Sequence, residues 1–113
     1  MQNRSSKPEL TFDILQKYLS LKYEGKVETT SLFMKLVEEI GEVAEALNQL
    51  DGRKTNTGDT SLEKELADVV HYTLAIASIN QIDLAKVIID KDKIASIKYR
   101  QDPNLESFLN TQR

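Results

Sequence analysis

Apolar residues recur along most of the chain at alternating steps of three and four positions, the spacing that places them on one face of an α-helix. One such stripe contains a single acid and consists of Leu32, Leu36, Glu39, Val43, Ala46 and Leu50. A second stripe also contains one acid and consists of Leu62, Glu65, Val69, Tyr72, Ile76 and Ile79. Alternation with a period of two is too weak to indicate strands. The pattern therefore predicts an all-α fold.

Four helices are expected, over residues 12 to 23, 31 to 50, 60 to 80 and 84 to 100, followed by a last short turn over 104 to 109. Gly25 and Gly52 follow the first two helices, as helix-ending glycines do. Thr60 starts a capping-box sequence, and Asp83 is a typical N-cap. Pro103 cannot continue the fourth helix. The Gly-, Thr- and Asn-rich stretch from 51 to 60 is expected to be a mobile loop.

The chain has 113 residues, which is enough for one domain with a modest core, so an oligomer is plausible. We expect a disordered tail over residues 1–10 and a single helical domain over residues 11–113. The net charge of −3 argues against binding to a nucleic acid polymer. The absence of cysteine excludes disulfides, thiolate zinc sites and cysteine nucleophiles. No apolar run is long enough for a membrane span, and the polar first ten residues lack a signal-peptide pattern, so a cytoplasmic location is expected.

Acids interrupt both apolar stripes, and each has a second acid one turn further along. Glu39 is followed by Glu42, and Glu65 is followed by Asp68. Moving an unpaired carboxylate out of water costs several kcal/mol, whereas like charges at this helical spacing cost only about 0.2–0.5 kcal/mol. Desolvation is thus the larger penalty, and a partner, a proton or a metal ion must offset it.

The simplest alternative is that the acidic run is a solvated helix face. That interpretation suits Glu38, Glu42 and Glu45, which cluster opposite Ile40. It does not suit the acids at positions 39 and 65, because they share a stripe with leucines and valines. The nearby lysines, Lys35 and Lys64, lie off the stripe and are poorly placed to neutralise these two acids.

A divalent cation between the two helices would resolve this conflict. Packed helices stand about 8–10 Å apart, so a glutamate from each can reach a shared ion. Carboxylate oxygens without imidazole or thiolate favour a hard ion, so Mg²⁺ is expected, with Mn²⁺ as an alternative. Magnesium bound in this way commonly receives substrate phosphates. The residues therefore indicate magnesium-dependent phosphate chemistry in a helical bundle.

The order of the acids resembles that of the MazG-type, all-α nucleoside triphosphate pyrophosphohydrolases. The shared pattern is Glu38-Glu39-x-x-Glu42, then twenty-two residues, then Glu65-x-x-Asp68, with an apolar helix following. The resemblance implies hydrolysis of nucleoside triphosphates between the α and β phosphates. It also implies a house-cleaning role in the nucleotide pool. It also implies a homodimer or homotetramer in which helices from two chains complete a bundle.

Carried over to this sequence, the resemblance makes Glu39, Glu42, Glu65 and Asp68 the metal ligands. Glu38 matches the first glutamate of the pattern and is assigned to orienting the attacking water, although the spacing alone leaves open which carboxylate does so. Lys91 and Lys98 stand seven residues apart on the fourth helix and are expected to contact substrate phosphates, or else to extend into solvent. His71 is expected to be a surface group or a neighbour of the site rather than a ligand.

Three other functions stay open at this stage. A related dimeric deoxyuridine or deoxycytidine nucleotide hydrolase is disfavoured, because those enzymes are generally longer and this chain lacks space for their extra helices, which leaves two. One is a phosphoribosyl-ATP pyrophosphohydrolase-like activity, because the segment from Glu65 to Tyr72 loosely resembles the equivalent segment of those enzymes. The other is a non-catalytic helical module whose acids bind a basic partner.

Overall fold

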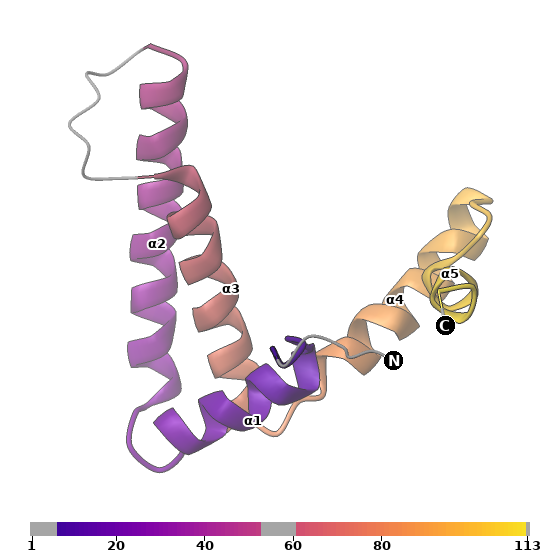
Figure 1. Cartoon of the computed structure of the whole chain (residues 1–113), viewed down its shortest axis with the longest axis horizontal. Helices are drawn as coiled ribbons and strands as arrows, with labels where there is room; N and C mark the ends of the chain where they lie inside the picture. The colour runs from indigo at the N-terminus through magenta and orange to yellow at the C-terminus, as the bar shows by residue number, and fades with distance from the viewer. Residues whose placement is uncertain (1–6, 53–60, 113) are drawn as a thin grey trace. The chain divides into compact units, whose positions relative to one another are not determined.

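The computed structural model describes residues 7–52 and 61–112, which form helices and connecting turns with no strand among them (Figure 1). The helices are α1 (Phe12–Tyr23), α2 (Thr29–Leu50), α3 (Leu62–Ile79), α4 (Leu84–Tyr99) and α5 (Leu105–Asn110). The predicted all-α fold is confirmed. The short turn expected after Pro103 is the fifth helix.

Side-chain caps account for several of the helix starts. Thr11 accepts a hydrogen bond from the backbone N–H of Ile14 at the start of α1, and Asp83 accepts one from the N–H of Lys86 at the start of α4. At the start of α3 the cap is Ser61. The expected capping box at Thr60 and most of the expected loop over 51 to 60 lie outside the described residues. Gly52 has a φ of +76°, a left-handed conformation that ends α2 where the sequence indicated.

The chain divides into two compact units, one ending at Ile82 and the other beginning at Asp83. In the first unit α2 and α3 pack side by side, and α1 packs against α3 (Figure 1). Leu19 of α1, Leu32 of α2 and Leu74 of α3 are fully buried, so each of the three helices contributes to one small core. Smaller buried residues fill the remaining space, namely Ala46, Ala75 and Ala77.

Polar contacts fix the end of α3 to α1 and α2. The Ser78 hydroxyl donates to the carbonyl oxygen of Gln16 at 3.0 Å, and the Gln16 amide donates to the carbonyl oxygen of Ile82 at 2.8 Å. The Asn80 amide donates to the Thr29 hydroxyl at 3.0 Å, at the first residue of α2. These contacts set how α1 and α2 approach α3 at this end of the unit.

The second unit is a hairpin of α4 and α5. The Asp92 carboxylate accepts a hydrogen bond of 2.6 Å from the backbone N–H of Leu105, at the start of α5. Lys93 forms an ion pair of 3.1 Å with Glu106. The two contacts hold the short helix against α4.

No single helix within the described residues is long and apolar enough to cross a membrane, although α3 and α4 taken together reach the length and composition of a broken span. Near the end of α3, the apolar residues Leu74, Ala75 and Ala77 are buried in the core of the first unit.

We expect the Leu19→Ala variant to lower the free energy of unfolding by about 2–5 kcal/mol, because Leu19 has no exposed surface and its truncation leaves a cavity. The matched control is Leu21→Ala in the same helix, whose side chain is 78% exposed and whose loss should change stability by less than about 0.5 kcal/mol. Urea denaturation measures both. Equal effects of the two substitutions would contradict the assignment of the core.

Candidate metal centre

Three carboxylates from two helices converge in the first unit. Glu39 comes from α2, and Glu65 and Asp68 come from α3. Each offers one oxygen, and these three oxygens all lie within 4.8 Å of one another. Glu39 and Glu65 are half-buried, whereas Asp68 is exposed. The group therefore sits at the edge of the contact between α2 and α3, reachable from solvent.

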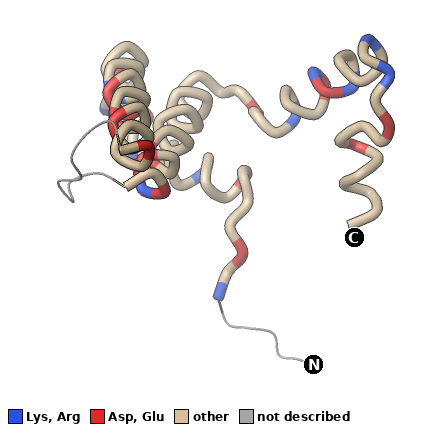
Figure 2. Tube along the Cα trace, turned by 90° about the horizontal axis from the view of Figure 1, so that it is seen from above, with Lys and Arg blue, Asp and Glu red and all other residues tan. Residues whose placement is uncertain are grey.

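Helix geometry explains this convergence. Glu39 lies on the same stripe of α2 as the buried Leu32, so its side chain is directed toward α3. Glu65 and Asp68 are three residues apart and therefore share a face of α3. Figure 2 shows acidic positions along this helix pair, coloured red. Packing of α2 on α3 is thus sufficient to bring the acids together.

Burial and the neighbouring acids strongly affect the pKa of Glu39. Burial, hydrogen bonding with Glu65 and the negative charges of Asp68 and Glu65 raise the pKa of Glu39 from 4.5 to about 7. The positive charge of Lys35 lowers the pKa of Glu39 but does not cancel these effects. Near neutral pH this carboxyl therefore holds a proton more readily than an ordinary glutamate, so the cluster favours a positive partner.

The donor set fits a hard divalent cation. Three carboxylates supply only oxygen ligands, the kind that Mg²⁺ and Mn²⁺ prefer, and their separation allows one ion to contact all three. A bound cation would also neutralise the charges of Asp68 and Glu65, which contribute to the raised pKa of Glu39.

Two of the expected acidic site residues lie outside this group. Glu42 is exposed, one turn along α2 from Glu39. Glu38 is also exposed, and its Oε1 lies 3.2 Å from the Nζ atom of Lys35. Their assignments as metal ligand and water-orienting residue stay predictions.

The two lysines expected to contact phosphates belong to the second unit. Lys91 and Lys98 are both exposed on α4, and the Nζ atom of Lys98 lies 5.3 Å from the centroid of the Tyr99 ring. Basic positions on α4 are coloured blue in Figure 2. The phosphate-contact assignment of Lys91 and Lys98 likewise stays a prediction.

The sequence did not indicate a contact between α1 and α3 next to the acids. The Tyr23 hydroxyl lies 2.8 Å from Nε2 of His71, and their rings meet edge to face. Burial, and then the charge of Lys22, lower the pKa of His71, so the imidazole is neutral at pH 7. His71 follows Asp68 by one turn of α3. This contact depends on how α1 crosses α3, and hydrophobic periodicity does not specify that crossing.

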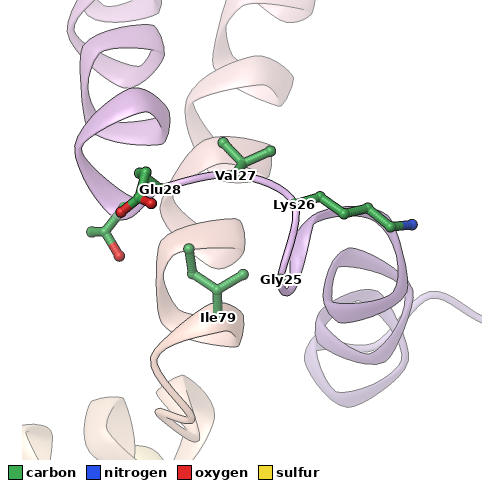
Figure 3. A pocket seen from close by; sticks show the side chains of 6 residues that line it. Gly25, Lys26, Val27, Glu28 and Ile79 are labelled. Carbon is green, nitrogen blue, oxygen red and sulfur yellow. The ribbon is translucent and has the colours of Figure 1, made fainter.

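A pocket of about 340 Å³ lies elsewhere in the same unit (Figure 3). It is formed by the turn between α1 and α2 together with Ile79 of α3, and its lining residues are Gly25, Lys26, Val27, Glu28, Thr29 and Ile79. Thr29 precedes Glu39 by ten residues of α2, which corresponds to about 15 Å along the helix axis. The pocket is therefore separate from the three acids.

The fold and the acids together define a class of protein, namely all-α domains with a cluster of carboxylates between two packed helices. Residues 27–96, well over half of the chain, match the family described as MazG nucleotide pyrophosphohydrolase domain. This range includes α2, α3 and most of α4. The chain belongs to this family, and membership points to nucleotide pyrophosphohydrolase chemistry.

A solved structure agrees with this assignment. The chain is similar to the crystal structure of iMazG from Vibrio DAT 722, with a TM-score of 0.66 and 26% sequence identity over 81% of this chain and 100% of that chain. A comparison with curated proteins gave no match.

The raised pKa of Glu39 predicts how the metal-free protein responds to pH. The folded state holds this proton more tightly than the unfolded state, whose carboxyl titrates near 4.5. The stabilisation is therefore complete below pH 4.5 and is lost as the pH rises to about 7. Because solvent screens a half-buried group, we expect a loss of only about 1 kcal/mol, or about 5 °C in Tm.

Thermal melts of the chelator-treated protein between pH 5 and 8 measure this effect. Glu39→Gln should flatten the pH profile, whereas Glu63→Gln, an exposed acid in the first turn of α3, should not. Adding Mg²⁺ at pH 8 should raise the wild-type Tm, because a ligand of the folded state adds stability. A Tm that is independent of both pH and Mg²⁺ would contradict the proposed site.

Proposed function

We propose that this protein is a Mg²⁺-dependent nucleoside triphosphate pyrophosphohydrolase. It cleaves ribo- or deoxyribonucleoside triphosphates between the α and β phosphates, giving a monophosphate and pyrophosphate. The observation that carries the proposal is the convergence of Glu39, Glu65 and Asp68 in a domain of the MazG family. The likeness to Vibrio iMazG over the whole of that chain supports it. We further propose a cytoplasmic, house-cleaning role in the nucleotide pool.

In this proposal Glu39, Glu65 and Asp68 hold the metal ion, with Glu42 as a fourth ligand. Mg²⁺ suits the all-oxygen set, and Mn²⁺ can replace it. When bound, the ion neutralises charge on the substrate phosphates. The two helices hold the carboxylates close together before the substrate arrives.

The reaction is an in-line attack of water on the α-phosphorus. A bond forms between the water oxygen and this phosphorus, and the bond from the phosphorus to the oxygen bridging the α and β phosphates breaks, so that pyrophosphate leaves. A carboxylate accepts the proton of the water. We assign this role to Glu38, which is exposed next to Glu39. The Lys91 and Lys98 ammonium groups of α4 are proposed to bind the departing phosphates.

A phosphoribosyl-ATP pyrophosphohydrolase-like activity is the alternative within the same chemistry. The segment Glu65-Leu-Ala-Asp68-Val-Val-His71-Tyr72 favours it only loosely, since its histidine and tyrosine stand in the opposite order from those enzymes. The alternative that is not an enzyme is a helical module whose acids bind a basic partner. The product assay described below separates all three.

We also propose that the protein is a homodimer or homotetramer. The part of α2 that faces away from α3 carries a second apolar stripe, at heptad-like steps of four, three and seven residues. Its large members are Phe33, Val37, Ile40 and Leu47, with exposed fractions of 51%, 45%, 53% and 42%. A second copy of the chain packing on this stripe would bury it and complete a helical bundle.

Product analysis tests the activity. Incubation with each nucleoside triphosphate and Mg²⁺, followed by ion-exchange separation, should yield monophosphate and pyrophosphate in equal amounts. Glu65→Gln and Asp68→Asn should each lower kcat at least about 100-fold, because each removes a charged ligand of the ion. Glu63→Gln, on the same helix but outside the cluster, is the matched control and should keep full activity.

Release of inorganic phosphate and a diphosphate, or full activity of both site variants, would refute this function. Turnover of phosphoribosyl-ATP in preference to all nucleoside triphosphates would favour the first alternative. No turnover of any of these substrates would favour the non-catalytic module.

The proposed interface predicts the response of the oligomer to a buried charge. Ile40→Glu should dissociate the protein into monomers in size-exclusion chromatography with light scattering, because the carboxylate would be desolvated in the interface. Met34→Glu is the matched control, since Met34 is 58% exposed but lies off the apolar stripe on α2. An unchanged mass for Ile40→Glu, or a monomeric wild type, would contradict the interface.

A further inference from the structure

A lysine lies on the same side of α2 as Glu39, one of the three acids. Lys35 lies on α2 one turn before Glu39, and its Nζ atom is 3.2 Å from Oε1 of Glu38. Glu38, followed by Tyr72 and Glu39, raises the pKa of the Lys35 ammonium. The ammonium is therefore charged, and it lies within electrostatic range of an acid of the cluster.

The charge of Lys35 also acts on residues of α3 and α1. It interacts with Tyr72 of α3 and, more weakly, lowers the pKa of Tyr23 of α1, which is raised mainly by burial. Tyr72 is one turn beyond Asp68, on the helix that supplies two of the acids. Lys35 thus belongs to the acid-bearing side of α2, next to the contact with α3, rather than to the outer apolar stripe.

The ion pair with Glu38 does not explain why a lysine occupies this place. The side chains of Lys35 and Glu38 are 48% and 62% exposed, and pairs this open to solvent contribute little to stability. The order, with the lysine preceding the glutamate, is also the less favourable one on a helix. Such a pair separates readily when a stronger anion arrives.

We infer that Lys35 binds a phosphate oxygen of the nucleotide beside the metal-binding acids. When the substrate binds, Lys35 leaves its ion pair with Glu38 and contacts the phosphate instead. The inference rests on the proposed function. A triphosphate brings several negative charges to a surface that already carries Glu38, Glu39 and Glu42, so a single divalent cation leaves excess negative charge. A lysine ammonium offers three donors on a flexible stem and is a common phosphate ligand.

If Lys35 has this role, removal of its charge should change two affinities in opposite directions. Divalent cations should bind the acids more tightly, because a nearby positive charge no longer repels them. A polyphosphate should bind less tightly, because one of its ligands is gone. A lysine that only supports the fold would weaken both when removed, because the acids would then lose their arrangement.

Isothermal titration calorimetry of the full chain tests this with two probes, Mn²⁺ alone and tripolyphosphate in the presence of Mg²⁺. For Lys35→Gln we expect Mn²⁺ to bind about threefold more tightly. We expect tripolyphosphate to bind about tenfold more weakly. Lys35→Arg keeps the charge and should restore most of the tripolyphosphate affinity. The matched control is Lys86→Gln, which removes a helix-surface lysine paired with Asp90 at 2.8 Å and should change neither affinity.

Weaker binding of both probes, unchanged binding of tripolyphosphate, or no binding of tripolyphosphate by the wild type would overturn the inference. Failure of the proposed function is a separate result. It would appear as the wrong hydrolysis products, or none, while the opposite changes in Mn²⁺ and tripolyphosphate affinity persist.

Discussion

Electrostatic repulsion among three carboxylates at the contact between two packed helices is the constraint on which the site depends. Glu39, Glu65 and Asp68 bring oxygens within 4.8 Å of one another, and burial, hydrogen bonding with Glu65 and the neighbouring negative charges raise the pKa of Glu39 to about 7. When these carboxylates are ionised and no cation is bound, such a group does not stabilise the fold. The cluster is therefore best explained by what it binds.

The remainder of the first unit holds the two acid-bearing helices in place. Leu32 and Leu74 are buried on α2 and α3, and Leu19 of α1 is buried with them. Hydrogen bonds from Ser78 and Asn80 fix the end of α3 to α1 and to the start of α2. Rigid support of this kind matters for a metal site, because its ligands must be arranged before the ion and the substrate arrive.

Much of this arrangement could be predicted from the sequence. The two apolar stripes identified Glu39 and Glu65 as the acids directed between helices, since a leucine or valine would be expected at each position. The end of α1 followed from Gly25, two residues after Tyr23, and the start of α4 followed from the N-cap Asp83. The start of α2 was predicted two residues too late, because its N-cap Glu28 makes no side-chain hydrogen bond and gives no capping signal.

Other features depend on tertiary geometry that periodicity does not encode. The contact between Tyr23 and His71 requires a particular crossing of α1 over α3, and two residues 48 positions apart carry no shared pattern. Lys35 lies off the apolar stripe, as the sequence indicated, but its long side chain still reaches Glu38. Helical spacing also grouped Glu42 with the other acids. In the structure, Glu39 is the only α2 residue of the three-acid cluster, and Glu42 lies outside it.

In the proposed function, the acid-bearing face combines two kinds of recognition. Carboxylates attract a hard cation, and a lysine beside them offers a positive charge to the anion that the cation accompanies. This pairing is the arrangement expected for a metal-bound polyphosphate. It also accounts for an acidic helical face that would otherwise repel its own proposed substrate.

The most direct test of the central claim is a crystal structure of the protein grown with Mn²⁺, with data collected to locate the anomalous signal of the ion. The account predicts a strong anomalous peak between α2 and α3, within about 2.0–2.3 Å of oxygens from Glu39, Glu65 and Asp68. A crystal saturated with Mn²⁺ in which these carboxylates point apart into solvent, with no peak between them, would contradict it.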